Sequence, residues 1–287
     1  DRVGLMAISS HPDDSAMDPS AIERRIVCGC IPVRISLSLT DLTSHIDQAP
    51  EPVYIIVNRI SYFTQVISQL FEIFSDYISA VACEPWLECD VLGPLQWQYP
   101  VGVLFDVLPV SEKRLPWHIT INFSRFPKTR LIRFNSTYNS TISYFRNSLK
   151  QASFLLFGST NPVMEISDVE IETFWKSLSE ENTSAKLNLE QPQDVEPSAR
   201  NHPVQFIFWN RTNGLQSRLK PYSVLEHWTI QSAFQRCAPD LSAEKYTFIT
   251  HGIELPPSYD LSFVSASLSY LDCFAYICCI SGHSIVD

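Results

Sequence analysis

The sequence contains little glycine, little cysteine and no long uninterrupted apolar run. Only 8 glycines occur in 287 residues, which excludes a collagen-like chain. The 8 cysteines are too sparse for a disulfide scaffold. The most apolar stretch, residues 60–81, is interrupted by polar side chains such as Gln65 and Glu72. It therefore lacks the roughly 20 consecutive apolar residues that a membrane-spanning helix needs.

The charge balance excludes a further class of protein. The formal net charge is −10, so the sequence predicts no broad surface for binding nucleic acid. Hydrophobic residues make up 45% of the chain and charged residues 18%, which is enough apolar material for packed cores. The length favours about two domains.

Catalytic sequence motifs are also missing. The chain has no glycine-rich phosphate loop, no G-x-S-x-G turn and no H-E-x-x-H zinc motif. A cysteine hydrolase remains an alternative, because the residue types occur without a local signature: Cys83, Cys89, Cys237, His118, His227 and His251. Most of these cysteines lie in apolar segments, where an inert buried thiol is usual. The pair Cys28 and Cys30 is more typical of a strand than of a metal site, and no metal or cofactor is predicted.

The first part of the chain shows both strand and helix patterns. Residues 24–39 are expected to form a strand or strand pair, since Val33, Ile35 and Leu37 alternate with polar residues. In residues 60–81, apolar side chains recur every three or four positions, which predicts one long amphipathic helix. The remaining expected elements are strands at 53–57, 86–89, 95–97 and 117–123, and a short helix at 101–108.

The middle of the chain is expected to be helical. Helices are predicted over residues 137–157 and 167–178, with Gly158 as a stop signal for the first. Ser167 and Glu170 have the spacing of a capping box for the second helix. The polar, proline-containing segment that follows predicts a linker.

The last part repeats the pattern of the first. A strand over residues 204–208 is followed by the hairpin signal Asn213-Gly214. A helix is predicted over residues 222–237, and strands over 246–250 and 274–280. A helix packed across a small mixed sheet is the β-grasp arrangement, so the element order favours an α+β fold with two such units around a helical middle.

Several motifs occur in an order that is typical of one protein family. Residues 95–106 read LQWQYPVGVLFD, and residues 115–123 read LPWHITINF. The first is similar to the W-x-Y-P-x-G-x-L-F-D block, and the second to the L-P-W-x-I-T-x-x-F block, of the autophagy protein 5 family. Residues 29–33 resemble the G-x-I-P-x strand of that family, and residues 251–254 and 268–274 resemble its C-terminal landmarks.

The resemblance implies an α+β chain of two ubiquitin-like β-grasp domains flanking a helix-rich domain. The division that follows places a flexible N-terminal extension at 1–22, the first ubiquitin-like domain at 23–126, the helix-rich domain at 127–182, a linker at 183–202 and the second ubiquitin-like domain at 203–287.

The resemblance also implies a role in autophagy without catalysis by the chain itself. Members of the family are joined by an isopeptide bond, through one lysine, to the terminal glycine of the ubiquitin-like autophagy protein 12, with the help of autophagy conjugating enzymes. The conjugate binds autophagy protein 16 non-covalently and promotes lipidation of autophagy protein 8. The implied location is the cytoplasm, with peripheral recruitment to the preautophagosomal membrane.

Lys150 matches the sequence context of the family's acceptor lysine. It is followed by Gln151 and Ala152 in the first predicted helix of the middle domain, and none of the other six lysines fits that pattern. Aminolysis of a thioester requires a neutral amine, and only about one in 10³ ordinary lysines is neutral near pH 7. The conjugating enzyme must therefore position and deprotonate it. Arg146, one turn earlier, is expected to favour the neutral amine slightly.

Two further interpretations stay open. Without the resemblance, Lys150 is an ordinary solvated lysine, and the chain is then a purely non-covalent β-grasp adaptor. The basic residues Lys128, Arg130 and Arg133 are interpreted as a solvated loop rather than a lipid site. The residues of a groove for a partner helix are not assigned.

Overall fold

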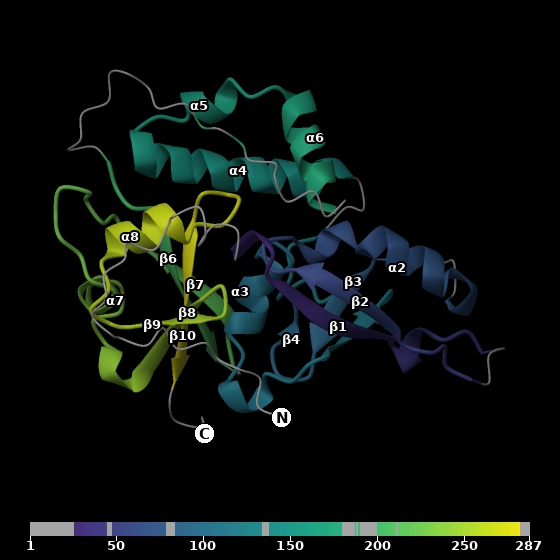
Figure 1. Ribbon diagram of the computed structural model, residues 1–287. Coiled ribbons are helices and arrows are strands. Elements are labelled where there is room, and N and C mark those ends of the chain that lie inside the picture. Colours follow the sequence, from purple (N-terminus) through teal and green to yellow (C-terminus); the bar gives the residue numbers. More distant parts are fainter. Residues whose placement is uncertain are drawn as a thin grey trace.

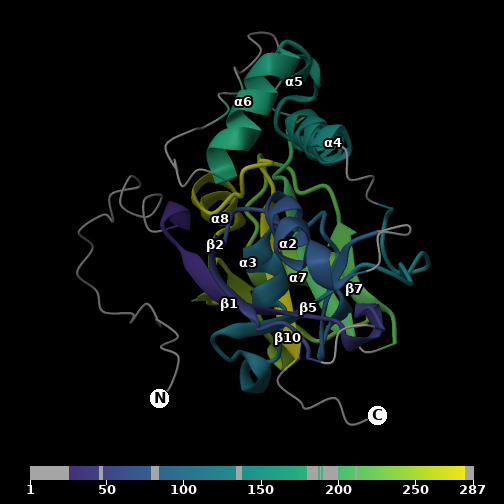
Figure 2. The same cartoon turned by 90° about the vertical axis from the view of Figure 1, so that its right-hand side faces the viewer.

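The computed structural model describes residues 26–44, 48–78, 84–133, 138–179, 187, 189, 200–210 and 212–281. Within these ranges, two five-stranded sheets form two domains, and a layer of helices lies over both (Figures 1 and 2). The expected α+β class is confirmed. The expected extension at 1–22 and most of the expected linker at 183–202 lie outside the described residues.

The first sheet has the strand order β2-β1-β5-β3-β4. Its central pair, β1 (Cys30–Leu37) and β5 (Trp117–Asn122), is parallel, with Val33 opposite Trp117 and Ile35 opposite Ile119. These four side chains are buried, which the alternating sequence pattern predicts. The flanking strands are β2 (Val53–Asn58), β3 (Trp86–Cys89) and β4 (Gly93–Pro94).

The helix of the first domain is shorter than the sequence predicts. The prediction of one helix over 60–81 is wrong: α2 (Ile67–Phe74) lies between the 3-10 turns η2 (Phe63–Gln65) and η3 (Ser75–Tyr77). Val66 and Phe74 have φ near −100° and ψ near 0°, which interrupts the helix at both ends. The apolar stripe itself is confirmed as far as it is described, because Phe63, Leu70 and Phe74 are buried. Residues 79–83 lie outside the described ranges.

Two strand predictions in this domain also need correction. Residues 95–97 are not a strand, because β4 ends at Pro94 and the backbone then turns, with the nitrogen of Tyr99 donating to the carbonyl of Gln96. The strand predicted over 24–39 begins only at Cys30, because the nitrogen of Gly29 donates to the carbonyl of Ile26 in a turn.

The short helix predicted over 101–108 is confirmed as α3 (Val101–Asp106), and all six of its residues are buried. Pro100 precedes it and sets the backbone for the first turn. A Cβ on Gly102 would lie 2.9 Å from the carbonyl oxygen of Arg59, so only glycine allows this close approach. The helix lies between the two sheets and packs on strands β8 and β10 of the second domain.

The second sheet repeats the wiring of the first, with the order β7-β6-β10-β8-β9. Its strands are β6 (Val204–Asn210), β7 (Gly214–Leu219), β8 (Tyr246–Thr250), β9 (Ile253–Leu255) and β10 (Ala275–Ser281). The central strands β6 and β10 are parallel, as β1 and β5 are in the first sheet. Both sheets therefore have the ubiquitin-like β-grasp topology that the sequence predicts.

The helix of the second domain is also shorter than predicted. The prediction over 222–237 is wrong in its first half, because α7 begins at Ile230 and ends at Cys237. The nitrogen of His202 donates to the carbonyl of Tyr222, and Val224 donates to Arg200, so this backbone pairs with a neighbouring segment. Helix α8 (Leu261–Ser267), which follows the cap Asp260, and strand β9 were not predicted.

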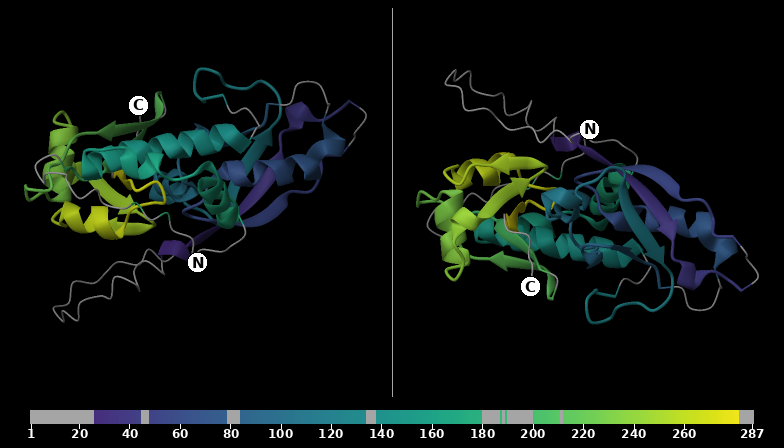
Figure 3. Two further views of the ribbon diagram at one scale, coloured as in Figure 1. Left: turned by 90° about the horizontal axis from the view of Figure 1, so that it is seen from above. Right: turned by 90° about the horizontal axis from the view of Figure 1, so that it is seen from below.

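The upper layer contains α4 (Tyr138–Phe157), α5 (Asn161–Met164) and α6 (Asp168–Ser179). Seen from above, α4 runs along the molecule from the first domain towards the second (Figure 3). The two predicted helices are confirmed, and α5 was not predicted. Gly158 has a φ of +66° and donates to the carbonyl of Phe154, so it ends α4 as expected. Ser167 and Glu170 form the expected capping box.

Candidate functional site

Helix α4 is fixed to the first domain and to α6 by an apolar cluster. Phe145 and Leu149 of α4 are buried against Tyr62 of the first domain and Trp175 of α6. The rings of Tyr62 and Trp175 stack with centroids 5.3 Å apart, and those of Phe145 and Trp175 lie 5.2 Å apart. Aromatic contacts of this kind add to the free energy of burial. This end of α4 is therefore a rigid support.

The other end of α4 is tied to the second domain. The backbone nitrogen of Asn201 donates to the carbonyl of Leu155 at 2.7 Å. The hydroxyl of Ser153 donates to the carbonyl of Ser159 at 2.8 Å, which closes the turn after the helix. Helix α4 is thus anchored on both sheet domains.

Lys150 lies on α4 directly after the fully buried Leu149. The residue is half-buried, and no hydrogen bond or ion pair joins its amine to another described residue. The neighbours on the helix surface include Asn147 and Phe154, which are both exposed. Lys150 therefore stands at the rim of the buried face of α4.

Arg146 does not act on Lys150 as an isolated like charge. Its guanidinium pairs with the carboxylate of Asp168 and donates to the carbonyl of Ile166, which ties α4 to the start of α6. Arg146 and Asp168 therefore form a pair of opposite charges between the two helices. Asp168 carries no sequence signal for this role, because 22 residues separate the partners.

The surroundings of Lys150 define its possible chemistry. The residues three and four positions away on α4 are Arg146, Asn147, Ser153 and Phe154, so no carboxylate or imidazole of the helix can act as a general base. A lysine amine held in this way can accept an acyl group from an activated ester, provided that the partner removes the proton.

The residues of the alternative cysteine hydrolase are not brought together. Burial raises the pKa of Cys89 and of Cys237, which disfavours the reactive thiolate. His118 is exposed on β5, whereas His251 is buried and stacks on Tyr270. Among the described residues, no hydrogen bond joins any of these cysteines to a histidine. Cys83 lies outside the described ranges.

The described residues contain neither a cluster of metal ligands nor a membrane-spanning helix. No three histidine, cysteine or acidic side chains gather in a way that could hold a metal ion. None of the described helices has the length and apolar character needed to cross a membrane.

Three family descriptions match the chain in order. Residues 26–123 match "Autophagy protein ATG5, UblA domain", residues 139–185 match "Autophagy protein ATG5, alpha-helical bundle region", and residues 201–279 match "Autophagy protein ATG5, UblB domain". The middle match contains α4 and therefore Lys150.

Individual relatives agree with these matches. Autophagy protein 5 of Drosophila melanogaster is 31% identical over 241 residues, which are 79% of this chain and 86% of the fly protein. Autophagy protein 5 of Arabidopsis thaliana is 35% identical over 151 residues, which are 52% of this chain and 43% of the plant protein. The crystal structure of Kluyveromyces marxianus Atg5 has the same fold, with a TM-score of 0.69, 19% identity and coverage of 90% of this chain and 98% of that one.

Proposed function

The chain belongs to the autophagy protein 5 family, and we propose that within autophagy it serves as a covalent conjugation acceptor and scaffold. The observation that carries the proposal is the half-buried Lys150, whose amine pairs with no other described residue, on a helix that is anchored to both ubiquitin-like domains. A fixed helix holds the backbone of Lys150 in place, so that the conjugating enzyme has only the flexible side chain to position against its thioester.

The proposed reaction joins Lys150 to the terminal glycine of autophagy protein 12. The Nζ atom attacks the carbonyl carbon of a thioester that the conjugating enzyme carries. The C–N bond forms, the C–S bond breaks, the thiolate leaves, and the amine proton passes to a base of the enzyme. The absence of a base among the helix neighbours of Lys150 fits a reaction in which the partner supplies it.

The conjugate is proposed to act as a scaffold. It binds autophagy protein 16 non-covalently and promotes the lipidation of autophagy protein 8, with the chain itself contributing no catalytic group. Such a role places it in the cytoplasm, with peripheral recruitment to the preautophagosomal membrane. The separated cysteines and histidines of the two sheets favour this scaffold over a hydrolase.

A reconstituted conjugation reaction tests the proposal. The full chain is incubated with autophagy protein 12, the activating and conjugating enzymes and ATP, and the covalent product is followed on a denaturing gel. We expect Lys150→Arg to abolish the product and Lys176→Arg, on the neighbouring helix α6, to leave it intact.

Two outcomes would contradict the proposal. A product that persists with Lys150→Arg assigns the acceptor to another lysine. The lack of any product with the unaltered chain, together with binding of autophagy protein 16, supports a purely non-covalent adaptor instead.

A further inference from the structure

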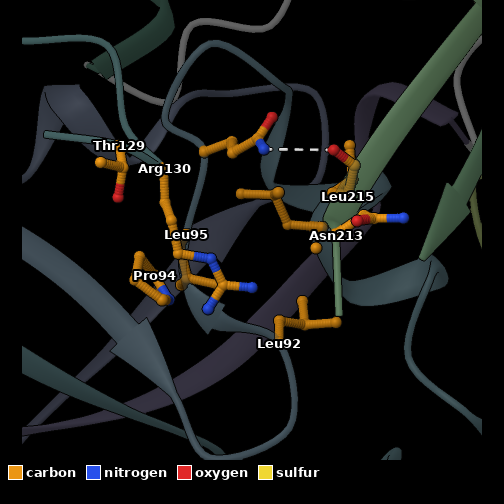
Figure 4. Close-up of a pocket in the computed structure, with 10 residues that line it drawn as sticks. Leu92, Pro94, Leu95, Thr129, Arg130, Asn213 and Leu215 are labelled. Carbon is orange, nitrogen blue, oxygen red and sulfur yellow. Dashed lines mark hydrogen bonds between the residues drawn. The ribbon is translucent and has the colours of Figure 1, made fainter. Parts of the chain in front are cut away.

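A cavity of about 130 Å³ lies between the two ubiquitin-like domains. One wall is the turn around β4 in the first domain, and the other is the β6–β7 hairpin of the second domain. Thr129 and Arg130 line its edge. Figure 4 shows the guanidinium of Arg130 extending between Pro94 and Leu95 on one side and Leu92 and Asn213 on the other.

Two glycines leave room for the guanidinium of Arg130. A Cβ on Gly93 would lie 3.2 Å from Nη1, and a Cβ on Gly214 would lie 3.2 Å from Nη2. Both glycines have a positive φ, of +70° and +71°, which other residues rarely adopt. The two walls are joined by a hydrogen bond of 3.2 Å from the side chain of Gln96 to the carbonyl of Leu215. The guanidinium is thus seated where the two domains meet.

The charge of Arg130 is not balanced inside the cavity. None of the residues that line it is acidic, and no described residue forms an ion pair with Arg130. Arg133, three residues later, differs because it pairs with Glu84 at 2.9 Å. The cavity is also far larger than the roughly 10–15 Å³ that one ordered water needs. It has room for an anion of several atoms.

We propose that this cavity binds a phosphate monoester. The planar guanidinium donates two parallel hydrogen bonds to two phosphate oxygens, and the hydroxyl of Thr129 donates to a third oxygen. A tetrahedral dianion suits the site better than a planar carboxylate, since it presents oxygens to donors in different directions and carries more charge. The monoester belongs either to a soluble molecule or to a lipid headgroup.

Binding of this kind has a consequence for the two domains. Because both walls contribute to the site, a bound phosphate contacts the first and the second domain at once. A ligand that binds only the folded chain raises its unfolding temperature. Phosphate is therefore expected to stabilise the full chain against heat.

Phosphate titration of the full chain tests the proposal. Binding of inorganic phosphate is measured by calorimetry and by the rise in unfolding temperature, at constant ionic strength. We expect Arg130→Gln to weaken binding by about tenfold or more, because the bidentate contact is lost. Arg133→Gln, a matched change in the same exposed segment, should leave the affinity unchanged. Thr129→Val provides a second variant and should weaken binding without altering the charge.

Vesicles distinguish the two sources of the monoester. Sedimentation with phosphatidylcholine vesicles is compared with and without phosphatidic acid, which carries a phosphate monoester. Binding that depends on Arg130 in either the phosphate or the vesicle experiment supports the proposal and identifies the source. Binding that is equal in the unaltered chain and Arg130→Gln, no binding in either experiment, or acetate binding as tightly as phosphate would overturn it.

Discussion

The carboxylate of Asp106 accepts a hydrogen bond of 2.8 Å from the backbone nitrogen of Gly252, 146 residues further along the chain. Its other oxygen pairs with the guanidinium of Arg59. Asp106 is only 1% exposed, so this charge is buried at the junction of α3 with the β8–β9 turn. The two family-like blocks at 95–106 and 251–254 therefore meet in space and hold the domains together.

Removing the charge of Asp106 should destabilise the chain strongly. In Asp106→Asn, the buried guanidinium of Arg59 loses its counter-charge, which typically costs about 3–5 kcal/mol. The free energy of unfolding in urea measures this loss. Asp168→Asn is the matched control, because Asp168 also pairs with an arginine but is 81% exposed. Its cost should be at most about 1 kcal/mol. Equal effects of the two changes would contradict the role of the buried pair.

Two neighbouring apolar residues of α4 should respond differently to truncation. Leu149 is 0% exposed within the cluster that holds α4, so Leu149→Ala should lower the free energy of unfolding by about 2–5 kcal/mol. Phe154 is 58% exposed, and Phe154→Ala should cost about 0.5 kcal/mol or less. Thermal and urea unfolding of both variants test this. A small loss for Leu149→Ala would show that α4 is not the rigid support described above.

The stability of the chain should depend on His251 at mildly acidic pH. Burial lowers the pKa of His251 from 6.5 to about 4. Between these values the unfolded chain binds a proton that the folded chain does not, so stability is lost as the pH falls. From pH 7 to pH 5 the contribution of His251 to this loss is on the order of 2 kcal/mol. His251→Asn removes this dependence, and asparagine tolerates the positive φ at this position.

Asp272 has the opposite effect on how stability depends on pH, so the unaltered chain must be compared with His251→Asn. Burial raises the pKa of Asp272 from 3.8 to about 6, so the folded chain takes up that proton first and gains stability as the pH falls through 6. Urea unfolding at pH 7 and pH 5 should show a larger loss in the unaltered chain than in His251→Asn. Equal losses in the two proteins would contradict a neutral, buried His251.

Much of the fold could be predicted from local patterns. The alternation around Val33 and Ile119 and the capping box of Ser167 and Glu170 depend on neighbouring residues only, so the sequence contains the whole signal. The stripe from Phe63 to Phe74 correctly identified buried side chains. It overestimated the length of the helix. Periodicity shows which side chains are buried, but it does not show where an α-helix gives way to a 3-10 turn.

Most of the wrong predictions concern features that are determined by contacts between residues far apart in the sequence. The predicted helix does not start at residue 222 because the backbone of residues 222–224 pairs with residues 200–202, a contact that no local pattern reveals. In contrast, the capping box of Thr229 and Ser232 was a local signal for the true start of α7 and was missed. For the candidate site, the position of Lys150 on a helix was predictable, whereas the pairing of Arg146 with Asp168 and the seating of Arg130 between two domains were not.

The most direct test of the central claim is peptide mapping of the conjugate by mass spectrometry. The chain is purified from autophagy-competent cells, digested with trypsin and searched for branched peptides. We predict a branch at Lys150 that carries the C-terminal glycine of autophagy protein 12, and cleavage after Lys150 should be blocked in that peptide. An unmodified Lys150 together with a branch at any of the other six lysines would contradict the account.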